Sequence, residues 1–300
     1  MIPESAPRRF HRPRGVVLAG DSYGQPGAPG ILLAHGGGQT RHAWGNTALA
    51  LAGRGWNAIT FDQRGHGDSD WDPAGDYRLE LFAEDLLAVA EVFPSPPALV
   101  GASLGGLAGL LAQGEMALSG GHRGFSAIVL VDVTPRVNQE GADHVLGFMS
   151  QHVVEGFGSL EEAAAVIAAY LPNRPAPENL DGLRKNLRLG SDQRYRWHWD
   201  PRFIAGRRSL SVWDYTSRLI QSARRLTVPT LLVRGLRSEV VADGEVQEFL
   251  ALAPHAQYIA LEEAGHMVAG DQNDRFSGAV VKFLESVPIG RPIGLSSASL

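Results

Sequence analysis

The chain has 300 residues, a formal net charge of −5, 44% hydrophobic residues and no cysteine. This length and composition predict a folded chain of one large α/β domain or two ordinary ones, and the missing cysteines exclude disulfides, thiolate metal sites and a cysteine nucleophile. The acidic balance argues against a nucleic-acid partner. The 36 glycines are 12% of the 300 residues, against roughly 7% in average proteins, and this excess predicts many tight turns.

The N-terminal segment carries several arginines and a run of only five apolar residues before Asp21. A secretory signal needs about 7–15 apolar residues, so a cytoplasmic protein is expected. The longest uncharged stretch, from Val92 to Gly114, contains three prolines and several glycines. It therefore predicts a loop, a strand and a helix in place of a membrane span. The expected partner is a small-molecule substrate, without a membrane or nucleic acid.

Short β-rich runs recur along the chain, with helical patterns between several of them. The runs are Gly15–Leu18, Ile31–His35, Asn57–Asp62, Ala98–Gly101, Ala127–Asp132, Thr230–Arg234 and Gln257–Leu261, and the helical patterns include His42–Ala52, Leu79–Val92, Leu104–Ala117 and Gly244–Ala253. Apolar strands that alternate with helices are typical of a parallel sheet covered on both faces. The fold class is therefore α/β.

A glycine-rich loop, His35–Gly38, follows the strand predicted at Ile31–Ala34. Acyl transfer needs N–H donors directed at the oxygen that becomes negative in the transition state, and the Gly37 N–H is the candidate donor. A phosphate cradle is the alternative, but the chain contains no G-x-x-x-x-G-K-[ST] motif. Gly38 and Trp44 are assigned to the substrate pocket.

The strongest motif is Gly101-Ala-Ser103-Leu-Gly105, between a predicted strand and an apolar helix. A serine on a sharp strand-to-helix turn is held in a strained conformation that exposes its hydroxyl, and small flanking residues let the turn close. Ser103 is therefore the predicted nucleophile, and the N–H of the next residue, Leu104, is the second oxyanion donor. The alternative is a packing turn whose serine caps the helix.

The alternation of strands and helices stops after Pro135. From about Arg136 to Arg225 the sequence is mainly helical, with a capping-box pattern at Ser159–Glu162 and helical spacing at Leu183–Leu189. We predict one core, residues 1–135 and 226–300, with a helical cap at 136–225 that shapes the ligand cleft. Two cap tryptophans, Trp197 and Trp199, are candidates for the pocket or for packing.

A serine nucleophile needs a base, and the base needs an acid that orients it. The base is predicted at His266, in a glycine turn after the last strand, and its neighbour Met267 is assigned to the pocket. Glu239, after the strand Thr230–Arg234, is the preferred acid, and Asp132, at the end of the preceding core strand, is the alternative.

His35 and His66 are the runners-up for the base, and both are expected to order loops. No pair of histidines has helix-face or chelating spacing with a carboxylate. No metal and no cofactor are therefore expected.

The order of serine, acid and histidine resembles the α/β-hydrolase fold superfamily, in its branch of serine esterases, cofactor-free haloperoxidases and epoxide hydrolases. The resemblance covers about Gly15–Pro135 and Val228–Leu284 and includes the D-x-R-G-x-G-x-S stretch Asp62–Ser69, which is interpreted as ordering its loop through ion pairs or caps of Asp62 and Arg64. It implies a mainly parallel eight-stranded sheet with a helical cap between strands six and seven.

Two departures from the resemblance bear on function. Epoxide hydrolases and haloalkane dehalogenases carry an aspartate nucleophile, so Ser103 disfavours both activities. The family's usual acid is an aspartate after strand seven, where this chain offers Glu239.

The leading hypothesis is a serine hydrolase that cleaves an ester or lactone of a small, fairly apolar substrate through an acyl-enzyme on Ser103. A C–C bond hydrolase or a perhydrolase would use the same triad. A ligand receptor on a hydrolase scaffold is the alternative from another class, and it would bind without rapid turnover.

Overall fold

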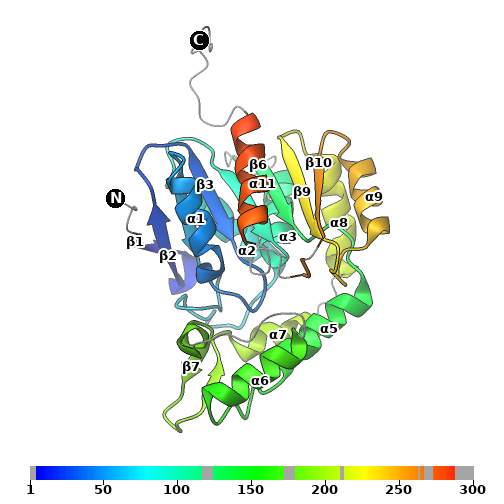
Figure 1. Cartoon of the computed structure of the whole chain (residues 1–300). Coiled ribbons are helices and arrows are strands. Elements are labelled where there is room, and N and C mark those ends of the chain that lie inside the picture. The colour runs from blue at the N-terminus through cyan, green and yellow to red at the C-terminus, as the bar shows by residue number, and fades with distance from the viewer. Residues whose placement is uncertain are drawn as a thin grey trace.

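A computed structural model of the chain describes residues 5–116, 124–171, 180–209, 213–262, 264–266 and 273–287. Its centre is an eight-stranded sheet in the order β1-β2-β4-β3-β5-β6-β9-β10 (Figure 1). The strands are β1 (Ala6–His11), β2 (Val17–Tyr23), β3 (Gly30–Ala34), β4 (Asn57–Phe61), β5 (Ala98–Ala102), β6 (Ala127–Val131), β9 (Thr230–Gly235) and β10 (Gln257–Leu261). β2 pairs antiparallel with both of its neighbours, β1 and β4, and every other pair of neighbouring strands in the sheet is parallel. The predicted α/β fold with a mainly parallel eight-stranded sheet is confirmed.

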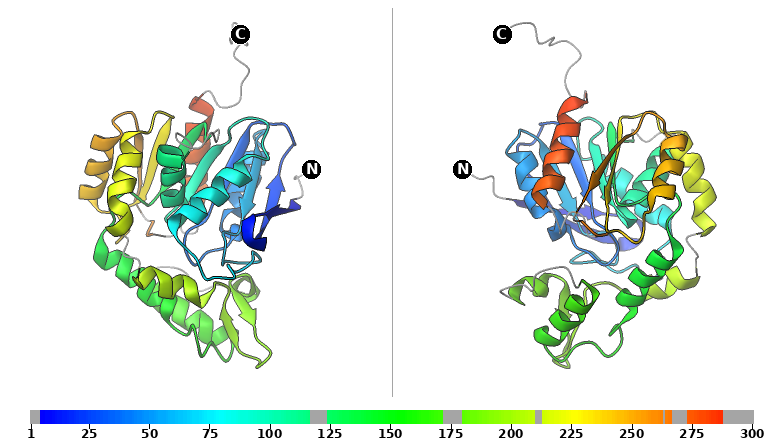
Figure 2. Two further views of the ribbon diagram at one scale, coloured as in Figure 1. Left: turned by 180° about the vertical axis from the view of Figure 1, so that it is seen from behind. Right: turned by 45° about the vertical axis from the view of Figure 1, so that its right-hand side comes forward.

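Helices cover both faces of the sheet (Figure 2). One face carries α1 (Gly45–Ala52) and α11 (Asn273–Ser286), and the other carries α2 (Leu79–Ala90), α3 (Leu104–Leu111), α8 (Trp213–Arg224) and α9 (Asp243–Leu252). Successive residues of a strand point to opposite faces, so on β3 Ile31 joins the core cluster beneath α1 and α11 while Leu32 joins the cluster beneath α2 and α3. Both are fully buried. This two-sided burial explains why the strands are apolar throughout.

The cap follows β6 and lies beyond the carboxyl ends of the parallel strands (Figures 1 and 2). It consists of α5 (Gln139–Ser150), α6 (Leu160–Tyr170), a 3-10 helix η4 (Leu180–Lys185), the antiparallel pair β7 (Leu187–Leu189) and β8 (Tyr195–Trp197), and α7 (Pro201–Ser209). The next helix, α8, packs against α3 and α9. The expected insertion at 136–225 thus includes one helix that lies in the core layer. No helix within the described ranges is long and apolar enough to cross a membrane.

Several local expectations differ from the structure. The region expected to be helical at Leu183–Leu189 is instead the end of η4 followed by β7, because an apolar–polar–apolar triplet suits a hairpin as well as a helix. The helix expected at Leu104–Ala117 ends at Leu111 and continues as a π-helix, η3, over Ala112–Met116. The helical pattern at His42–Ala52 is divided between a 3-10 helix, η2 (Arg41–Trp44), and α1. The strand expected at Gly15–Leu18 begins at Val17, because Gly15 ends another 3-10 helix, η1 (Pro13–Gly15).

Candidate active site

Ser103 lies on a sharp turn between β5 and α3. Its φ of 44° and ψ of −111° place it outside the regions that most residues adopt, a strain that persists only where the surroundings impose it. The surroundings leave no room for larger neighbours, since a Cβ at Gly101 would lie 2.6 Å from the Gly105 carbonyl oxygen and one at Gly105 would lie 2.6 Å from that of Ala34. The Ser103 side chain is partly exposed, as a nucleophile requires.

The loop after β3 passes directly beside Ser103. A Cβ at Gly36 would lie 3.3 Å from the Ser103 Cβ. The N–H of Gly36 donates to Gln39 (2.8 Å) and that of Gly38 to a histidine ring (3.1 Å), whereas the Gly37 N–H donates to no residue within the described ranges. Leu104 is the first residue of α3, so its N–H has no partner within the helix. The two N–H groups predicted as oxyanion donors are thus available to a ligand.

His266 contacts a buried carboxylate. Its Nδ1 lies 2.6 Å from Asp132 Oδ2, and the Asp132 side chain is fully buried at the end of β6. Two further donors hold this carboxylate: the Gly235 N–H at Oδ1 (3.1 Å) and the Ser238 hydroxyl at Oδ2 (2.5 Å). Asp132 has a φ of 50°, so it shares with Ser103 a conformation that is uncommon for residues other than glycine.

The structure corrects the preferred acid. Glu239 does not face His266: its exposed carboxylate lies 2.9 Å from Nδ1 of His144, on the cap helix α5. The turn after β9 directs Ser238 toward Asp132 and leaves Glu239 on the outside, where its backbone packs against Gly141. Position after a strand did not distinguish the two acids, and the alternative, Asp132, is the one that contacts the histidine.

Two buried histidines of the core support the glycine-rich loop, as expected from the sequence. His35 Nε2 accepts from the Gln63 N–H (2.9 Å), so its proton is on Nδ1, which donates to the Gly36 carbonyl (2.8 Å). His66 Nε2 accepts from the Gly38 N–H (3.1 Å). Burial lowers the pKa of His35, which keeps this imidazole neutral and able to accept a hydrogen bond.

A third histidine comes from the cap and was not singled out from the sequence. His198 Nδ1 accepts from the Gly67 N–H (2.7 Å), and its Nε2–H donates to the Gly38 carbonyl (3.2 Å). Burial lowers the pKa of His198 to about 3. One neutral imidazole thereby joins the cap to two loops of the core, including the loop that carries Gly37.

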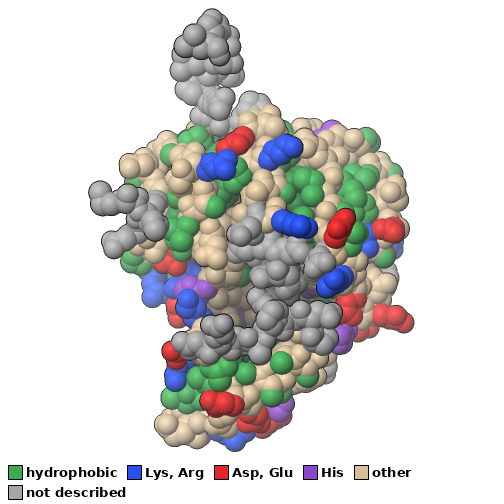
Figure 3. Space-filling view, viewed as in Figure 1, with side chains coloured by type: hydrophobic (Ala, Val, Ile, Leu, Met, Phe, Trp, Pro, Cys, Tyr) green, Lys and Arg blue, Asp and Glu red, His purple; other side chains and the backbone are tan. Residues whose placement is uncertain are grey.

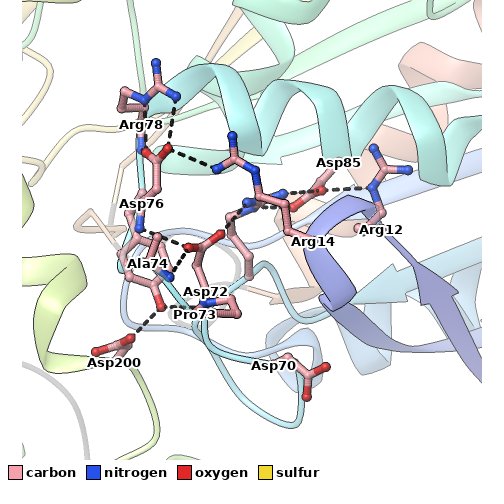
Figure 4. Close-up of polar contacts among 12 residues, drawn as sticks. Arg12, Arg14, Asp70, Asp72, Pro73, Ala74, Asp76, Arg78, Asp85 and Asp200 are labelled. Atoms are coloured by element: carbon pink, nitrogen blue, oxygen red, sulfur yellow. Dashed lines mark hydrogen bonds and ion pairs between the residues drawn. The ribbon is translucent and has the colours of Figure 1, made fainter.

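The D-x-R-G stretch forms the ion pairs that the sequence suggested, although Asp62 and Arg64 have different partners. Asp62 pairs with Arg41, while Arg64 pairs with Asp85 (2.7 Å) and Asp72 (3.3 Å). Asp85 also binds Arg12 of the N-terminal segment at 3.0 Å, a contact that Figure 4 shows. Buried charges require such pairing, so the network fixes the loop below the cap.

The residues assigned to the pocket lie in different places. Gly38 lines the site, and a Cβ there would lie 2.8 Å from Met149 Cε of the cap. The structure does not support the assignment of Trp44 to the pocket. Its side chain is fully buried and packs against Phe276 of α11, with ring centroids 5.7 Å apart. Trp197 and Trp199 stack on each other at 4.7 Å inside the cap. Met267 lies outside the described residues.

Comparison with known proteins identifies the family. Residues 31–279 match the family model described as the alpha/beta hydrolase family. The chain belongs to this family. It is 31% identical over 252 residues to esterase Rv0045c of Mycobacterium tuberculosis, with 82% of this chain and 79% of that protein covered.

Solved structures agree with this membership. A structure of the M. tuberculosis esterase Rv0045c has a TM-score of 0.72 at 25% identity and covers 95% of this chain and 93% of that chain. An alpha/beta hydrolase from Novosphingobium aromaticivorans has a TM-score of 0.78 and covers 96% and 100%; at 24% identity this likeness concerns the fold.

In this alpha/beta hydrolase the carboxylate beside the histidine follows the sixth core strand, β6, and not the seventh, β9. The acid and the serine thus come from the ends of adjacent parallel strands, β6 and β5. Across the parts of the chain that the structure describes, no group of three or more metal-binding side chains is placed to hold a metal ion.

Proposed function

We propose that this alpha/beta hydrolase is a serine hydrolase that cleaves a carboxylic ester or lactone through an acyl-enzyme on Ser103. The observation that carries the proposal is the 2.6 Å contact between His266 and buried Asp132. Asp132 directly follows β6, which pairs with β5, the strand that leads into the strained turn of Ser103. The similarity to a mycobacterial esterase supports an ester as the substrate class.

In the proposed mechanism each group has a distinct role. The Asp132 carboxylate accepts the Nδ1–H of His266 and so leaves Nε2 to remove the proton from the Ser103 hydroxyl. The N–H groups of Gly37 and Leu104 stabilise the oxyanion of the tetrahedral intermediate. His266 then delivers its proton to the leaving alcohol, and in the second half-reaction it activates the water that releases the acid.

Apolar side chains from the cap face the oxyanion loop and favour a substrate with an apolar acyl group. A Cβ at Gly37 would lie 3.5 Å from Phe203, and Met149 approaches Gly38. Phe203 and Met149 are both buried in the main core cluster. Apolar walls with a few directed polar groups are the usual lining of small-molecule sites.

The first prediction tests the nucleophile. Ser103→Ala is expected to lower kcat for a p-nitrophenyl ester by about 10⁶-fold, because no other group forms the acyl-enzyme. Ser286→Ala, which removes an exposed hydroxyl on α11, is the matched control and should retain activity.

Undiminished turnover by the Ser103→Ala variant would overturn the proposal. Mass spectrometry of the parent enzyme after rapid quenching should detect an acyl adduct on the peptide that contains Ser103. Saturable binding of ester to the parent enzyme without product release would indicate the receptor alternative instead.

A further inference from the structure

A second cleft lies between the core and the cap, apart from Ser103. It has a volume of about 100 Å³, and its lining includes Arg41, His42 and Asp68 of the core and Arg184, Lys185 and Arg188 of the cap. We refer to it as the basic cleft. Figure 3 shows basic and histidine side chains gathered at the left side of the molecule, where the core meets the cap.

The acidic side chains of the basic cleft are already occupied by one arginine. Arg41 pairs with Asp62, with Asp68 (2.8 Å) and with Asp21 outside the cleft (2.7 Å). Asp62 also accepts the backbone N–H of Arg41 (2.6 Å). Arg41 therefore offsets part of the negative charge of these carboxylates, and with Arg184, Lys185 and Arg188 the lining carries four cations against the two carboxylates of Asp62 and Asp68.

The three cations of the cap have few anionic partners. The Lys185 side chain forms no hydrogen bond or ion pair with any residue in the described ranges. The Arg188 guanidinium donates to the Gly67 carbonyl and lies over the indole ring of Trp71. Arg184 contacts a tyrosine hydroxyl and one exposed carboxylate, that of Asp181, at 3.6 Å. The cleft thus concentrates positive charge in a chain whose net charge is −5.

The half-buried His42 responds to this charge. Burial lowers its pKa, and the positive charges of Arg41 and Lys185 lower it further, against the opposing effect of Asp62 and Asp21. A cleft with an excess of one sign of charge raises the local concentration of the opposite ion.

We propose that the basic cleft binds a phosphate group, either as inorganic phosphate or as the end of a phosphate monoester. Such a group carries about −1.5 to −2 charges at pH 7 and presents three or more acceptor oxygens, which arginine can bind with two parallel N–H donors and lysine as a point charge. The volume accommodates one such group and not a whole drug-sized ligand.

Bound phosphate would contact both sides of the cleft and tie the cap to the core. Lys185 and Arg188 belong to the cap, whereas His42 and Gly67 belong to the core. A ligand that binds only the folded protein raises its stability by RT ln(1 + L/Kd), where L is the free ligand concentration. The proposal is therefore independent of the esterase chemistry at Ser103.

The chain offers a matched control, because Lys185 and Lys282 are its only lysines. Both are exposed, and Lys282 lies on α11, far along the chain from the cleft. We would titrate the full chain with sodium phosphate and with glycerol 3-phosphate by calorimetry at constant ionic strength, since surface charges are screened by salt. Circular dichroism of each variant would check folding.

Lys185→Glu is expected to weaken phosphate binding about 10- to 100-fold, the effect of losing one charged hydrogen bond, and Lys282→Glu should leave it unchanged. Phosphate should also protect Lys185, and not Lys282, from reductive methylation followed by mass spectrometry. Tighter binding of glycerol 3-phosphate than of inorganic phosphate would identify a monoester as the ligand, and the reverse would identify the free ion.

Equal binding by Lys185→Glu and the parent chain would overturn the proposal, as would equal protection of both lysines. Titration with sodium malonate, a planar dicarboxylate of similar charge, provides a further test: binding as tight as that of phosphate would contradict selectivity for a tetrahedral anion.

Discussion

Asp132 Oδ2 accepts two hydrogen bonds, one from His266 and one from the Ser238 hydroxyl, and Oδ1 accepts the Gly235 N–H. A carboxylate held by three donors cannot rotate freely, so it fixes the orientation of the imidazole. Glu239, in contrast, is exposed and paired with His144. The two acids therefore predict opposite responses to amide substitution.

Asp132→Asn is expected to lower kcat for an activated ester by about 10⁴-fold, because an amide N–H in place of the carboxylate favours the wrong histidine tautomer. Glu239→Gln, the matched control, should change kcat by less than a factor of about three, as exposed pairs contribute little. Steady-state kinetics of both variants at pH 7.5 would show whether Asp132 or Glu239 is the acid that orients His266. A large loss in Glu239→Gln with normal activity in Asp132→Asn would reverse the assignment.

The positions of the proposed nucleophile and base could be predicted from the sequence because their motifs are local. The backbone of Gly101–Gly105 dictates the turn by sterics alone, and His266 sits in a glycine turn after the last core strand. The acid depends on a contact between residues 134 positions apart, and two strands end in suitable carboxylates. Local sequence does not say which one the next turn directs inward.

At the scale of elements, cap and core meet through His198, which follows β8 and bonds to the Gly67 N–H and the Gly38 carbonyl. A substitution that keeps a ring but removes both nitrogens would leave these two backbone groups without a partner. An unsatisfied buried polar group costs about 1–3 kcal/mol.

His198→Phe is therefore expected to lower the free energy of unfolding by about 2–4 kcal/mol and to lower kcat, because Gly38 adjoins the oxyanion donor Gly37. His144→Phe, at an exposed histidine of the same cap, should shift stability by no more than about 0.5 kcal/mol. Urea unfolding would measure both, and a His198→Phe chain as stable as the parent would contradict the bridging role.

The sequence predicts the parallel strands of the core well, but it does not predict the edge strand β1 or the strands of the cap. Parallel strands such as Asn57–Phe61 and Gln257–Leu261 lie within one residue of their predicted ranges, since burial on both faces marks them with apolar residues. β1 (Ala6–His11) is a polar edge strand with a single buried residue, and β7 has only three residues. Such segments are held by tertiary pairing, which leaves little trace in the local sequence.

At the scale of the whole molecule, buried neutral histidines link stability to pH. Burial lowers the pKa of His35, and it lowers that of His198 to about 3, whereas both titrate near 6.5 when unfolded. Between these values the unfolded chain binds a proton at each site and the folded chain does not, so the free energy of unfolding rises with pH. The ion-paired carboxylates of Asp68 and Asp192 have lowered pKa values too and act in the same direction at lower pH.

The stability contributed by neutral His35 and His198 is thus complete above about pH 6.5 and is lost as the pH falls below it. Each buried histidine contributes a slope of about 1.4 kcal/mol per pH unit, so the decline should begin near pH 6.5, well above the range in which carboxylates alone would act. Urea unfolding at pH 7.5, 6.5, 5.5 and 4.5 would measure the slope. The His198→Phe chain lacks one of these imidazoles, so its free energy of unfolding should change by about 1.4 kcal/mol less per pH unit than that of the parent. A flat profile between pH 7 and 5 in the parent would show that these imidazoles are protonated within the fold.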